Sequence, residues 1–259
     1  MKFGTIASGS SGNCLYAGST DTHLLIDAGI SCKRICEGLA SFNVSGKDIQ
    51  GILITHEHSD HISGLGVLSR KLKIPIYGTQ ATLEEILKSK SVGKIDESLL
   101  HPVKAGEAFW VGDIQVKAFS IPHDAADPVS YTLINGGTKL GMVTDLGYFD
   151  HYIVDQLKSS DVLYVEANHD VNMLQVGPYP YYLKQRILGS HGHLCNEMSG
   201  KLVKELLNDH LSHVILGHLS KENNFPELAL KTVQMECDGA DPVFMVAPRN
   251  CAGPLITMG

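Results

Sequence analysis

Residues 55–61 are Thr-His-Glu-His-Ser-Asp-His, and they directly follow a short apolar run. Such a run is typical of a buried strand, and the residues after the motif have helical periodicity. Because alternate residues of an extended loop point the same way, His56 and His58 can bind one metal ion. The start of the helix turns Asp60 and His61 towards a second position. Imidazole and carboxylate ligands suit zinc, and manganese or iron less selectively; the alternative is a polar loop with chance histidines.

The composition is that of an ordinary globular chain. Its 259 residues are 43% hydrophobic and 19% charged, which predicts a single domain over residues 1–259 with a sizeable core. The net charge of −7 is not that of a protein that binds nucleic acid by a basic surface alone. Two bound cations would make a cleft locally positive, so a phosphate substrate remains compatible with this charge.

The chain has none of the sequence features of secretion or membrane insertion. Its first residues lack the apolar stretch of a signal peptide, and no apolar run has the length of a membrane span. Six cysteines are scattered along the chain, and in this context we expect them to be reduced thiols, several of them buried. We therefore predict a cytoplasmic protein without membrane contact.

Alternating strand and helix patterns predict the fold class. Apolar runs between turn residues predict strands at 2–7, 14–17, 23–26, 51–55, 74–77, 109–111, 114–119, 129–134, 139–144, 162–165, 214–216 and 243–246. Helical spacing predicts helices at 31–42, 62–72, 79–88, 150–157, 178–188, 196–207 and 226–235. A group of strands is followed by strands that alternate with helices, and this order occurs twice along the chain. It favours an α/β fold in which two sheets pack together with helices outside, a four-layer αββα sandwich.

The motif His-x-His-x-Asp-His after a strand resembles the signature of the metallo-β-lactamase superfamily, and other landmarks follow in the expected order. Asp27, in Leu-Leu-Ile-Asp-Ala-Gly, matches the residue that braces the metal loop. His123 in Ile-Pro-His-Asp matches a ligand of the first metal, and Asp145 in Met-Val-Thr-Asp-Leu-Gly matches the carboxylate that bridges both metals. His218, in Val-Ile-Leu-Gly-His-Leu-Ser, matches the last ligand of the second metal. Taken alone, Asp27 would be a turn or cap residue and His123 a loop residue.

The resemblance implies two divalent metal ions, zinc or manganese, with iron as a further option. Seven side chains would bind them: His56, His58 and His123 at the first, Asp60, His61 and His218 at the second, and Asp145 at both. A water between the metals loses a proton near neutral pH and becomes the nucleophile, while the metals neutralise charge on the attacked group. Asp60 would also help to orient this nucleophile.

Two further segments resemble the tRNA 3′-processing nucleases of the superfamily. Glu166 falls on the Glu of their "HEAT" segment, with Val165 in place of the His, and His193 falls on the proton-donating His of their "GHST" segment. A Glu–His pair is a suitable general acid for the leaving alkoxide, because the carboxylate raises the pKa of the imidazole. Alternatively, His193 is only a residue that leads into a helix.

The residues at other motif positions indicate which branch of the superfamily the chain resembles. Lactamases often have Cys where this chain has Asp145, and flavodiiron proteins have an acid where it has His58. The chain lacks the long arm of the tRNA enzymes and the inserted domain of the β-CASP nucleases. It most resembles the compact WalJ/YycJ group, regarded as exonucleases on DNA, in the segments 8–13, 168–170 and 192–197. Cys195 stands where this group is expected to have Ser, so the resemblance of the segment 192–197 is incomplete at this position.

The first of these segments, Ser-Gly-Ser-Ser-Gly-Asn, is a candidate phosphate-binding loop. Glycines allow close approach of the backbone, and hydroxyl and amide groups hold phosphate, so we predict substrate contacts from Ser8, Ser10, Ser11 and Asn13. The alternative is a plain hairpin turn, since no Walker lysine is present. His169 either lines the substrate pocket or simply lies on its loop.

The leading hypothesis is a dinuclear metal-dependent phosphodiesterase, a 5′→3′ exonuclease on DNA. The second is a small-substrate hydrolase for thioesters, lactones or cyclic phosphodiesters, which the compact, acidic chain favours. The third is a non-catalytic, metal-bound scaffold, against which the intact ligand set argues. The sequence leaves open the metal, the strand polarity, DNA or RNA as substrate, and the oligomeric state.

Overall fold

A computed structural model describes residues 1–237, 239 and 242–259, which form two compact units. Unit 1 comprises Met1–Ser120, Ala125–Thr138 and Pro248–Gly259, and unit 2 comprises Ile121–Asp124 and Lys139–Ala247. Whether the two units behave as the single domain expected from the sequence stays a prediction. Within the part of the chain that the structure describes, no helix has both the length and the apolar character needed to cross a bilayer.

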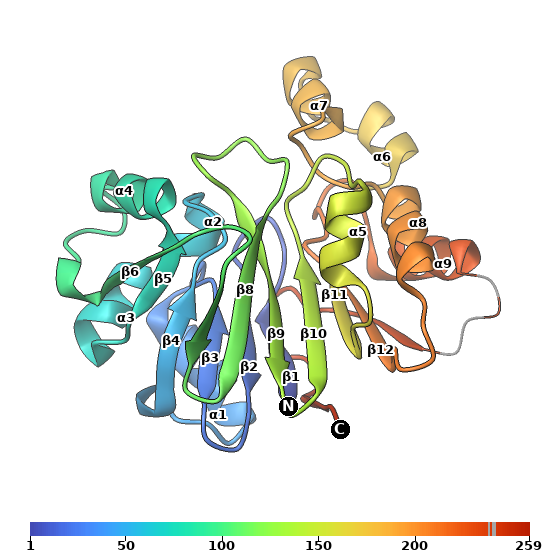
Figure 1. Cartoon of the computed structure of the whole chain (residues 1–259). Helices are drawn as coiled ribbons and strands as arrows, with labels where there is room; N and C mark the ends of the chain where they lie inside the picture. Colours follow the sequence, from blue (N-terminus) through green and yellow to red (C-terminus); the bar gives the residue numbers. More distant parts are fainter. Residues whose placement is uncertain (238, 240–241) are drawn as a thin grey trace. The chain divides into compact units, whose positions relative to one another are not determined.

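Unit 1 is built on a seven-stranded sheet with the order β14-β1-β2-β3-β4-β5-β6 (Figure 1). Its strands are β1 (Lys2–Ala7), β2 (Cys14–Gly18), β3 (His23–Ile26), β4 (Ile49–Leu53), β5 (Ile76–Thr79), β6 (Leu100–Val103) and β14 (Ile256–Thr257). The first four in spatial order pair antiparallel, whereas β3, β4, β5 and β6 pair parallel. Parallel pairing places the carboxyl ends of β3 and β4 at the same edge, and the predicted Asp27 and His56 follow these two ends.

Some helices of unit 1 begin after a capping side chain, and others begin without one. The helices of the unit are α1 (Cys32–Ser41), α2 (Ser59–Ile62), α3 (Leu65–Leu72) and α4 (Gln80–Lys88), with 3-10 turns η1 (Gly46–Asp48) and η2 (Glu97–Leu99). The Ser31 side chain accepts from the Arg34 N–H at the start of α1, as its predicted N-cap role requires. Apolar residues of these helices, such as Ile35, Leu39 and Leu68, join the buried core of the unit.

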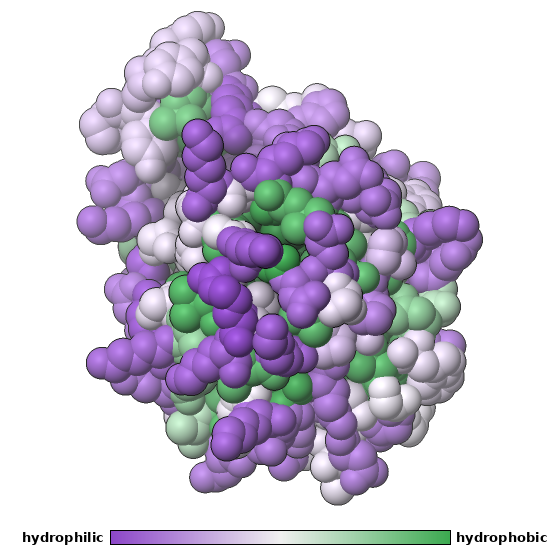
Figure 2. Space-filling model, turned by 90° about the vertical axis from the view of Figure 1, so that its left-hand side faces the viewer, coloured by the Kyte–Doolittle hydropathy of each residue, from purple (hydrophilic) through white to green (hydrophobic). Residues whose placement is uncertain are grey.

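An antiparallel meander completes unit 1, formed by β7 (Ala108–Val111), β8 (Ile114–Ser120) and β9 (Val129–Asn135). Its buried Tyr131 donates a hydrogen bond of 2.7 Å from its hydroxyl to the Ile54 carbonyl, just beyond β4. The meander is thereby joined to the loop that carries the metal motif. Figure 2 shows the side on which α3 and α4 lie; hydrophilic residues cover most of it, and hydrophobic ones show in the gaps between them.

Unit 2 has four parallel strands in the order β10 (from Thr138 to Val143, starting at the unit boundary), β11 (Val162–Glu166), β12 (His213–Gly217) and β13 (Val243–Val246). Its helices are α5 (His151–Leu157), α6 (Val171–Val176), α7 (Tyr181–Leu188), α8 (Asn196–Leu206) and α9 (Pro226–Glu236). In the register of β11 and β12, Glu166 lies opposite Gly217. Asp145, Glu166 and His218 therefore lie at or just beyond the carboxyl ends of neighbouring strands.

Several predicted boundaries are wrong, and proline or a capping side chain explains some of the differences. The helix predicted at 178–188 begins at Tyr181, because Pro178 and Pro180 restrict the residues before them to extended backbone. The unpredicted α6 begins at Val171, after its N-cap Asp170, whose carboxylate accepts from the Met173 N–H. The unpredicted β6 contains Pro102, which it tolerates as an edge strand.

Other differences concern the ends of elements. The strand predicted at 51–55 is β4 at Ile49–Leu53, and the one predicted at 74–77 is β5 at Ile76–Thr79. The helix predicted at 62–72 is divided into α2 and α3, because the Gly64 N–H donates to the Ala28 carbonyl instead of continuing a helical ladder. The two-residue β14 was not predicted at all.

Candidate functional site

The three histidines of the motif gather beyond the end of β4 in unit 1. His58 has extended backbone and is the N-cap of α2, so the chain turns into a helix directly after it. The His56 ring centroid lies 4.6 Å from that of His58 and 4.1 Å from that of His61. His56 and His61 are fully buried, whereas His58 is partly exposed. The short segment between β4 and α2, together with the first turn of α2, thus places three imidazoles together.

Asp27 holds this loop because both of its carboxylate oxygens accept hydrogen bonds from it. Oδ1 accepts from the Thr55 N–H at 2.9 Å, and Oδ2 accepts from His61 Nδ1 at 2.7 Å. Asp27 has a φ of 60°, in the left-handed region that non-glycine residues seldom adopt, and the carboxylate is buried. A carboxylate on Nδ1 fixes the imidazole tautomer and leaves Nε2 as the nitrogen that could bind a metal, the arrangement common around metal-bound histidines.

Thr55 is a supporting residue that the sequence reasoning missed. Its hydroxyl donates to Asp27 Oδ2 at 2.9 Å and lies 3.0 Å from His56 Nδ1. The hydroxyl therefore links the bracing carboxylate to a second imidazole. The only indication in the sequence is a hydroxyl residue between an apolar strand and the first histidine of the motif.

Replacing Asp27 by asparagine tests this support. An amide has only one oxygen, so its NH2 group would face donors from Thr55 or His61. We expect the free energy of unfolding to fall by about 1–3 kcal/mol, the cost of leaving buried polar groups unsatisfied. Metal affinity should fall about 10–100-fold, as for other residues that orient a ligand. Urea unfolding and metal titration measure both effects; D21N, at an exposed aspartate, is the matched control, and wild-type affinity in D27N would contradict the assignment.

The Ser8–Asn13 loop divides into buried and exposed residues. Ser8 and Asn13 are buried, whereas Ser10 and Ser11 are exposed. The Asn13 amide nitrogen lies 3.1 Å from His61 Nε2 and 3.4 Å from an Asp60 carboxylate oxygen. Asn13 thus faces the metal motif, and only the two serines reach the surface. The substrate contacts predicted for this loop stay predictions.

Glycine permits the close approach of a second loop to the motif. A Cβ atom on Gly29 would lie 1.6 Å from the Asp60 carbonyl oxygen, so only glycine fits there. The Ala28 N–H donates to the His61 carbonyl at 2.8 Å, and the Asn13 N–H donates to the Asp60 carbonyl at the same distance. Backbone hydrogen bonds therefore hold the residues that carry Asp60 and His61.

In unit 2, a buried carboxylate gathers the predicted site residues. Potential ligand atoms of Asp145, Glu166, His193 and His218 all lie within 4.8 Å of one another. Glu166 Oε1 accepts from His193 Nδ1 at 2.7 Å and from His218 Nδ1 at 2.8 Å. Its Oε2 accepts from two backbone N–H groups, those of Leu146 and Leu194. The sequence predicted the pair with His193, and the structure adds His218 as an equal partner.

The charge of Glu166 is stabilised although the residue is fully buried. Burial alone would raise its pKa, but the attraction of His193, with hydrogen bonds from both histidines, outweighs burial and holds the pKa well below its ordinary value. His193 is 20% exposed, so its ring joins the buried carboxylate to solvent. With Nδ1 held by Glu166, Nε2 is the nitrogen of His193 that can meet a substrate.

Two residues of this cluster have left-handed backbone at the point where a strand ends. Asp145 has a φ of 59° and His218 a φ of 54°, and each strained residue costs about 1–3 kcal/mol unless its surroundings hold it. The Thr144 hydroxyl donates to Asp145 Oδ2 at 2.7 Å, and the Glu166 bond holds His218. The buried His123 lies with Nε2 at 4.0 Å from Asp145 Oδ1 and Nδ1 at 3.3 Å from the Gly192 carbonyl.

His169 and Cys195 lie on adjoining segments of unit 2, in an isolated parallel bridge. Burial lowers the pKa of His169 to about 4, so the ring is neutral at physiological pH, and its Nε2 has no hydrogen-bond partner among the described residues. Its role in substrate binding stays a prediction. Cys195 is the N-cap of α8 without a side-chain cap bond, since a thiol is a weak acceptor where serine would cap well.

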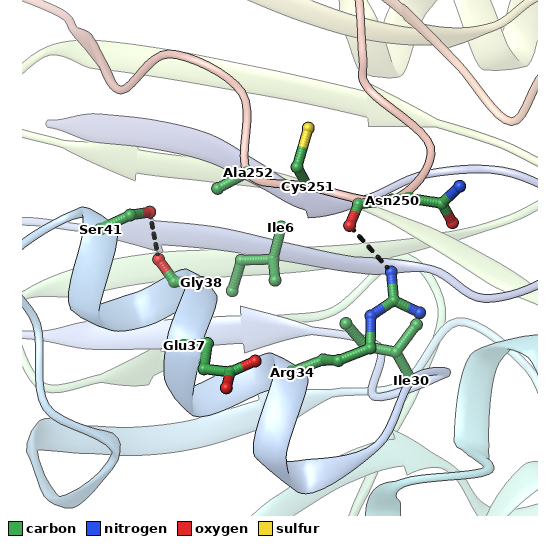
Figure 3. Close-up of a pocket in the computed structure, with 9 residues that line it drawn as sticks. All are labelled: Ile6, Ile30, Arg34, Glu37, Gly38, Ser41, Asn250, Cys251 and Ala252. Atoms are coloured by element: carbon green, nitrogen blue, oxygen red, sulfur yellow. Dashed lines mark hydrogen bonds between the residues drawn. The ribbon is translucent and has the colours of Figure 1, made fainter.

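A pocket of unit 1 lies between α1, Ile6 of β1 and the C-terminal segment at residues 250–252 (Figure 3). Its volume is about 250 Å³, and its polar side chains include Arg34 and Glu37. The Arg34 guanidinium donates to the Asn250 carbonyl at 3.2 Å, so the cation serves to hold the C-terminal segment. Among the described residues, none of the side-chain groups that could hold a metal ion includes a residue that lines this pocket.

Comparison with known proteins matches most of the chain. The model of the β-lactamase superfamily domain matches residues 22–218. The chain is 40% identical to exodeoxyribonuclease YycJ of Bacillus anthracis, over 90% of this chain and 88% of that protein. It is 41% identical to exodeoxyribonuclease WalJ of Streptococcus pneumoniae, over 93% of this chain and 90% of that protein.

A solved structure of similar fold is the metallo-β-lactamase fold protein YhfI of Bacillus subtilis. The two chains superpose with a TM-score of 0.72 at 18% identity, covering 97% of this chain and 98% of the other. Likeness at this identity concerns the fold alone, and it confirms the predicted α/β fold class, the four-layer αββα sandwich.

Proposed function

Because this chain belongs to the metallo-β-lactamase superfamily, we propose that it is a dinuclear metal-dependent phosphodiesterase, a 5′→3′ exonuclease on DNA. The observation that carries the proposal is the buried Glu166 bound to both His193 and His218. It joins a candidate proton donor to a candidate metal ligand through one carboxylate. Two relatives named exodeoxyribonucleases, about 40% identical over most of the chain, support DNA as the substrate.

The side chains present fit two divalent cations. His61 and His218 each have Nδ1 on a buried carboxylate, which is how metal-bound histidines are usually oriented. We propose the ligands predicted from the sequence: His56, His58 and His123 for the first cation, Asp60, His61 and His218 for the second, and Asp145 for both. Bound cations supply Lewis acidity and lower the pKa of a water towards neutrality. Zinc or manganese fits this donor set, with iron as a further option.

The protein's own groups would orient the nucleophile and protonate the leaving group. Asp60, whose carboxylate is partly exposed, would orient the attacking water. His193 would donate a proton from Nε2 to the alkoxide that leaves, because Glu166 holds Nδ1 and stabilises the imidazolium. Glu166 stays ionised through this transfer and acts by positioning both histidines.

Substrate contacts are proposed for two buried and two exposed residues of the glycine-rich loop, Ser8, Asn13, Ser10 and Ser11, and for the buried His169. Gly12 has a φ of 152° and would place a Cβ atom 2.5 Å from an Ile30 methyl carbon, so the loop needs glycine at this position. The hydroxyls of Ser10 and Ser11 are the groups of this loop that a phosphate would reach from solvent. A cytoplasmic location also stays a prediction.

The test is one assay of purified protein with zinc, manganese or iron added in turn. Substrates are DNA and RNA labelled at the 5′ or the 3′ end, single- and double-stranded, with a thioester, a lactone and a cyclic nucleotide beside them. Metal-dependent release of mononucleotides from the 5′ end of DNA is the expected result. Turnover of only a small substrate would replace the proposal by the second hypothesis. Protein that stays inert with every substrate after each metal has been added would replace it by the non-catalytic scaffold.

Metal removal gives an independent prediction about stability. Protein dialysed against a chelator should have a lower unfolding midpoint than the same protein after the metal is returned. An ion that binds only the folded state stabilises that state. At 100 times the dissociation constant the gain is about 2.7 kcal/mol per site. Thermal unfolding at increasing metal concentration measures the shift. If added metal leaves the unfolding midpoint unchanged in both the wild-type chain and H58A, the proposed centre does not bind the ion.

A further inference from the structure

Residues 171–196 of unit 2 differ in charge from the rest of the chain. They contain Lys184, Arg186, His191 and His193 but no aspartate or glutamate, although the whole chain has a net charge of −7. The segment forms α6 and α7, and Figure 1 shows these helices standing beyond α5 and α8 within unit 2. The Lys184 ammonium donates to two backbone carbonyls and the Arg186 guanidinium pairs with Asp124, so both cations are engaged within the unit. What suits the segment to a polyanion is that it carries no carboxylate of its own.

The same segment exposes large aromatic side chains. Tyr181 is 77% exposed and Tyr182 75%, and they are adjacent at the start of α7. α7 buries only Ile187, so most of its surface faces solvent. Aromatic rings with this exposure offer flat apolar faces together with a polar edge, which is the character of a stacking surface.

α7 is connected directly to the candidate proton donor. The His193 N–H donates to the Ile187 carbonyl at 3.0 Å, and the Gly192 N–H donates to the Gly189 carbonyl at 2.9 Å. A Cβ atom on Gly192 would lie 2.2 Å from the Ile187 carbonyl oxygen, so the turn folds back closely onto the last turn of the helix. A ligand held on α7 is thus held by the element that positions His193.

A second exposed pair of tyrosines begins beside this turn. Gly147 packs against it, since a Cβ there would lie 2.3 Å from the Ser190 carbonyl carbon. Tyr148 follows directly and is 45% exposed, and Tyr152, at the start of α5, is 44% exposed. Four exposed tyrosines therefore come from the two segments that meet at the turn before His193.

We propose that α7 is a docking platform for single-stranded DNA, on which unpaired bases stack on Tyr181 and Tyr182 while the strand runs along α7 towards His193. Stacking on aromatic rings tolerates any base, since every base has a π face, and it needs bases that are not paired. The inference rests on the proposed function and deepens it: the preferred substrate is a single strand, or a duplex with a single-stranded end.

Binding provides the direct test. The manganese-loaded full chain is titrated into a fluorescein-labelled 12-nucleotide phosphorothioate oligothymidylate, which resists cleavage, and anisotropy is recorded. Loss of a stacked base raises the dissociation constant by about 5–150-fold, so Y181A/Y182A should weaken binding at least 5-fold. Y181F/Y182F should restore it, because phenylalanine keeps the ring. W110A removes an equally exposed aromatic from β7 of unit 1 and should bind as wild type does.

Kinetics separate this inference from the proposed function. Y181A/Y182A should raise KM for a 12-nucleotide DNA and leave hydrolysis of bis(4-nitrophenyl) phosphate unchanged, because a small diester does not reach the platform. Wild-type protein inert towards both substrates would overturn the proposed function, while the binding titration still decides the platform. Wild-type oligonucleotide affinity in Y181A/Y182A would overturn the platform, and a dimer that this variant dissociates would then assign α7 to a second copy of the chain.

Discussion

Glu166→Gln is expected to lower kcat on DNA by about 10²–10⁴-fold, the range attributed to a positioned general acid. Glu166 accepts four hydrogen bonds, two from histidine rings and two from backbone N–H groups. Glutamine has the same shape, but its NH2 group must face one of these pairs of donors. The variant therefore loses the charge that stabilises the imidazolium of His193 and also loosens His218.

The leaving group distinguishes lost proton donation from general damage. 4-Nitrophenolate is a stable anion and needs little protonation, so E166Q should lose much less activity on bis(4-nitrophenyl) phosphate than on DNA. E205Q, at an exposed glutamate of α8, is the matched control and should retain wild-type kinetics with both substrates. Equal losses on DNA and on the chromogenic diester would refute the role in proton donation and leave Glu166 with a structural role alone.

Asp60→Ala and His58→Ala should each abolish metal-dependent cleavage of a DNA end, with a loss of about 10³-fold or more. Loss of a cation removes both the acidified water and the charge neutralisation of the attacked phosphate. Both side chains are partly exposed, so their removal leaves little cavity and the variants should fold. Cleavage of end-labelled DNA measures the effect, and metal content by mass spectrometry of the protein shows whether an ion has been lost.

Controls for these variants come from an exposed loop of unit 2. D209A and H210A remove the same two residue types outside the candidate site and should cleave DNA at the wild-type rate. Wild-type cleavage by either D60A or H58A would remove the metal motif from the mechanism. Full metal content in an inactive D60A would instead limit Asp60 to orienting the nucleophile.

Local sequence was sufficient to locate the metal motif and most strands. Gly51–Leu53 belong to β4 and His58 caps α2, because strand and helix periodicity act over a few residues. The same reasoning placed Asp145, Glu166 and His218 at strand ends. It missed α6 and the late start of α7, since proline and a capping aspartate outweighed helical spacing there.

The sequence by itself determined the family, the order of the candidate ligands and their places after strands, since each depends on neighbouring residues. Only the tertiary structure decided which groups share a carboxylate. Parallel pairing of β11 and β12 brings Glu166 to His218, 52 residues away, and the turn that follows α7 brings it to His193, 27 residues away. The exposure of Tyr181 and Tyr182 was likewise decided by packing, because a helix shows its solvent face only once the rest of the unit has covered the other.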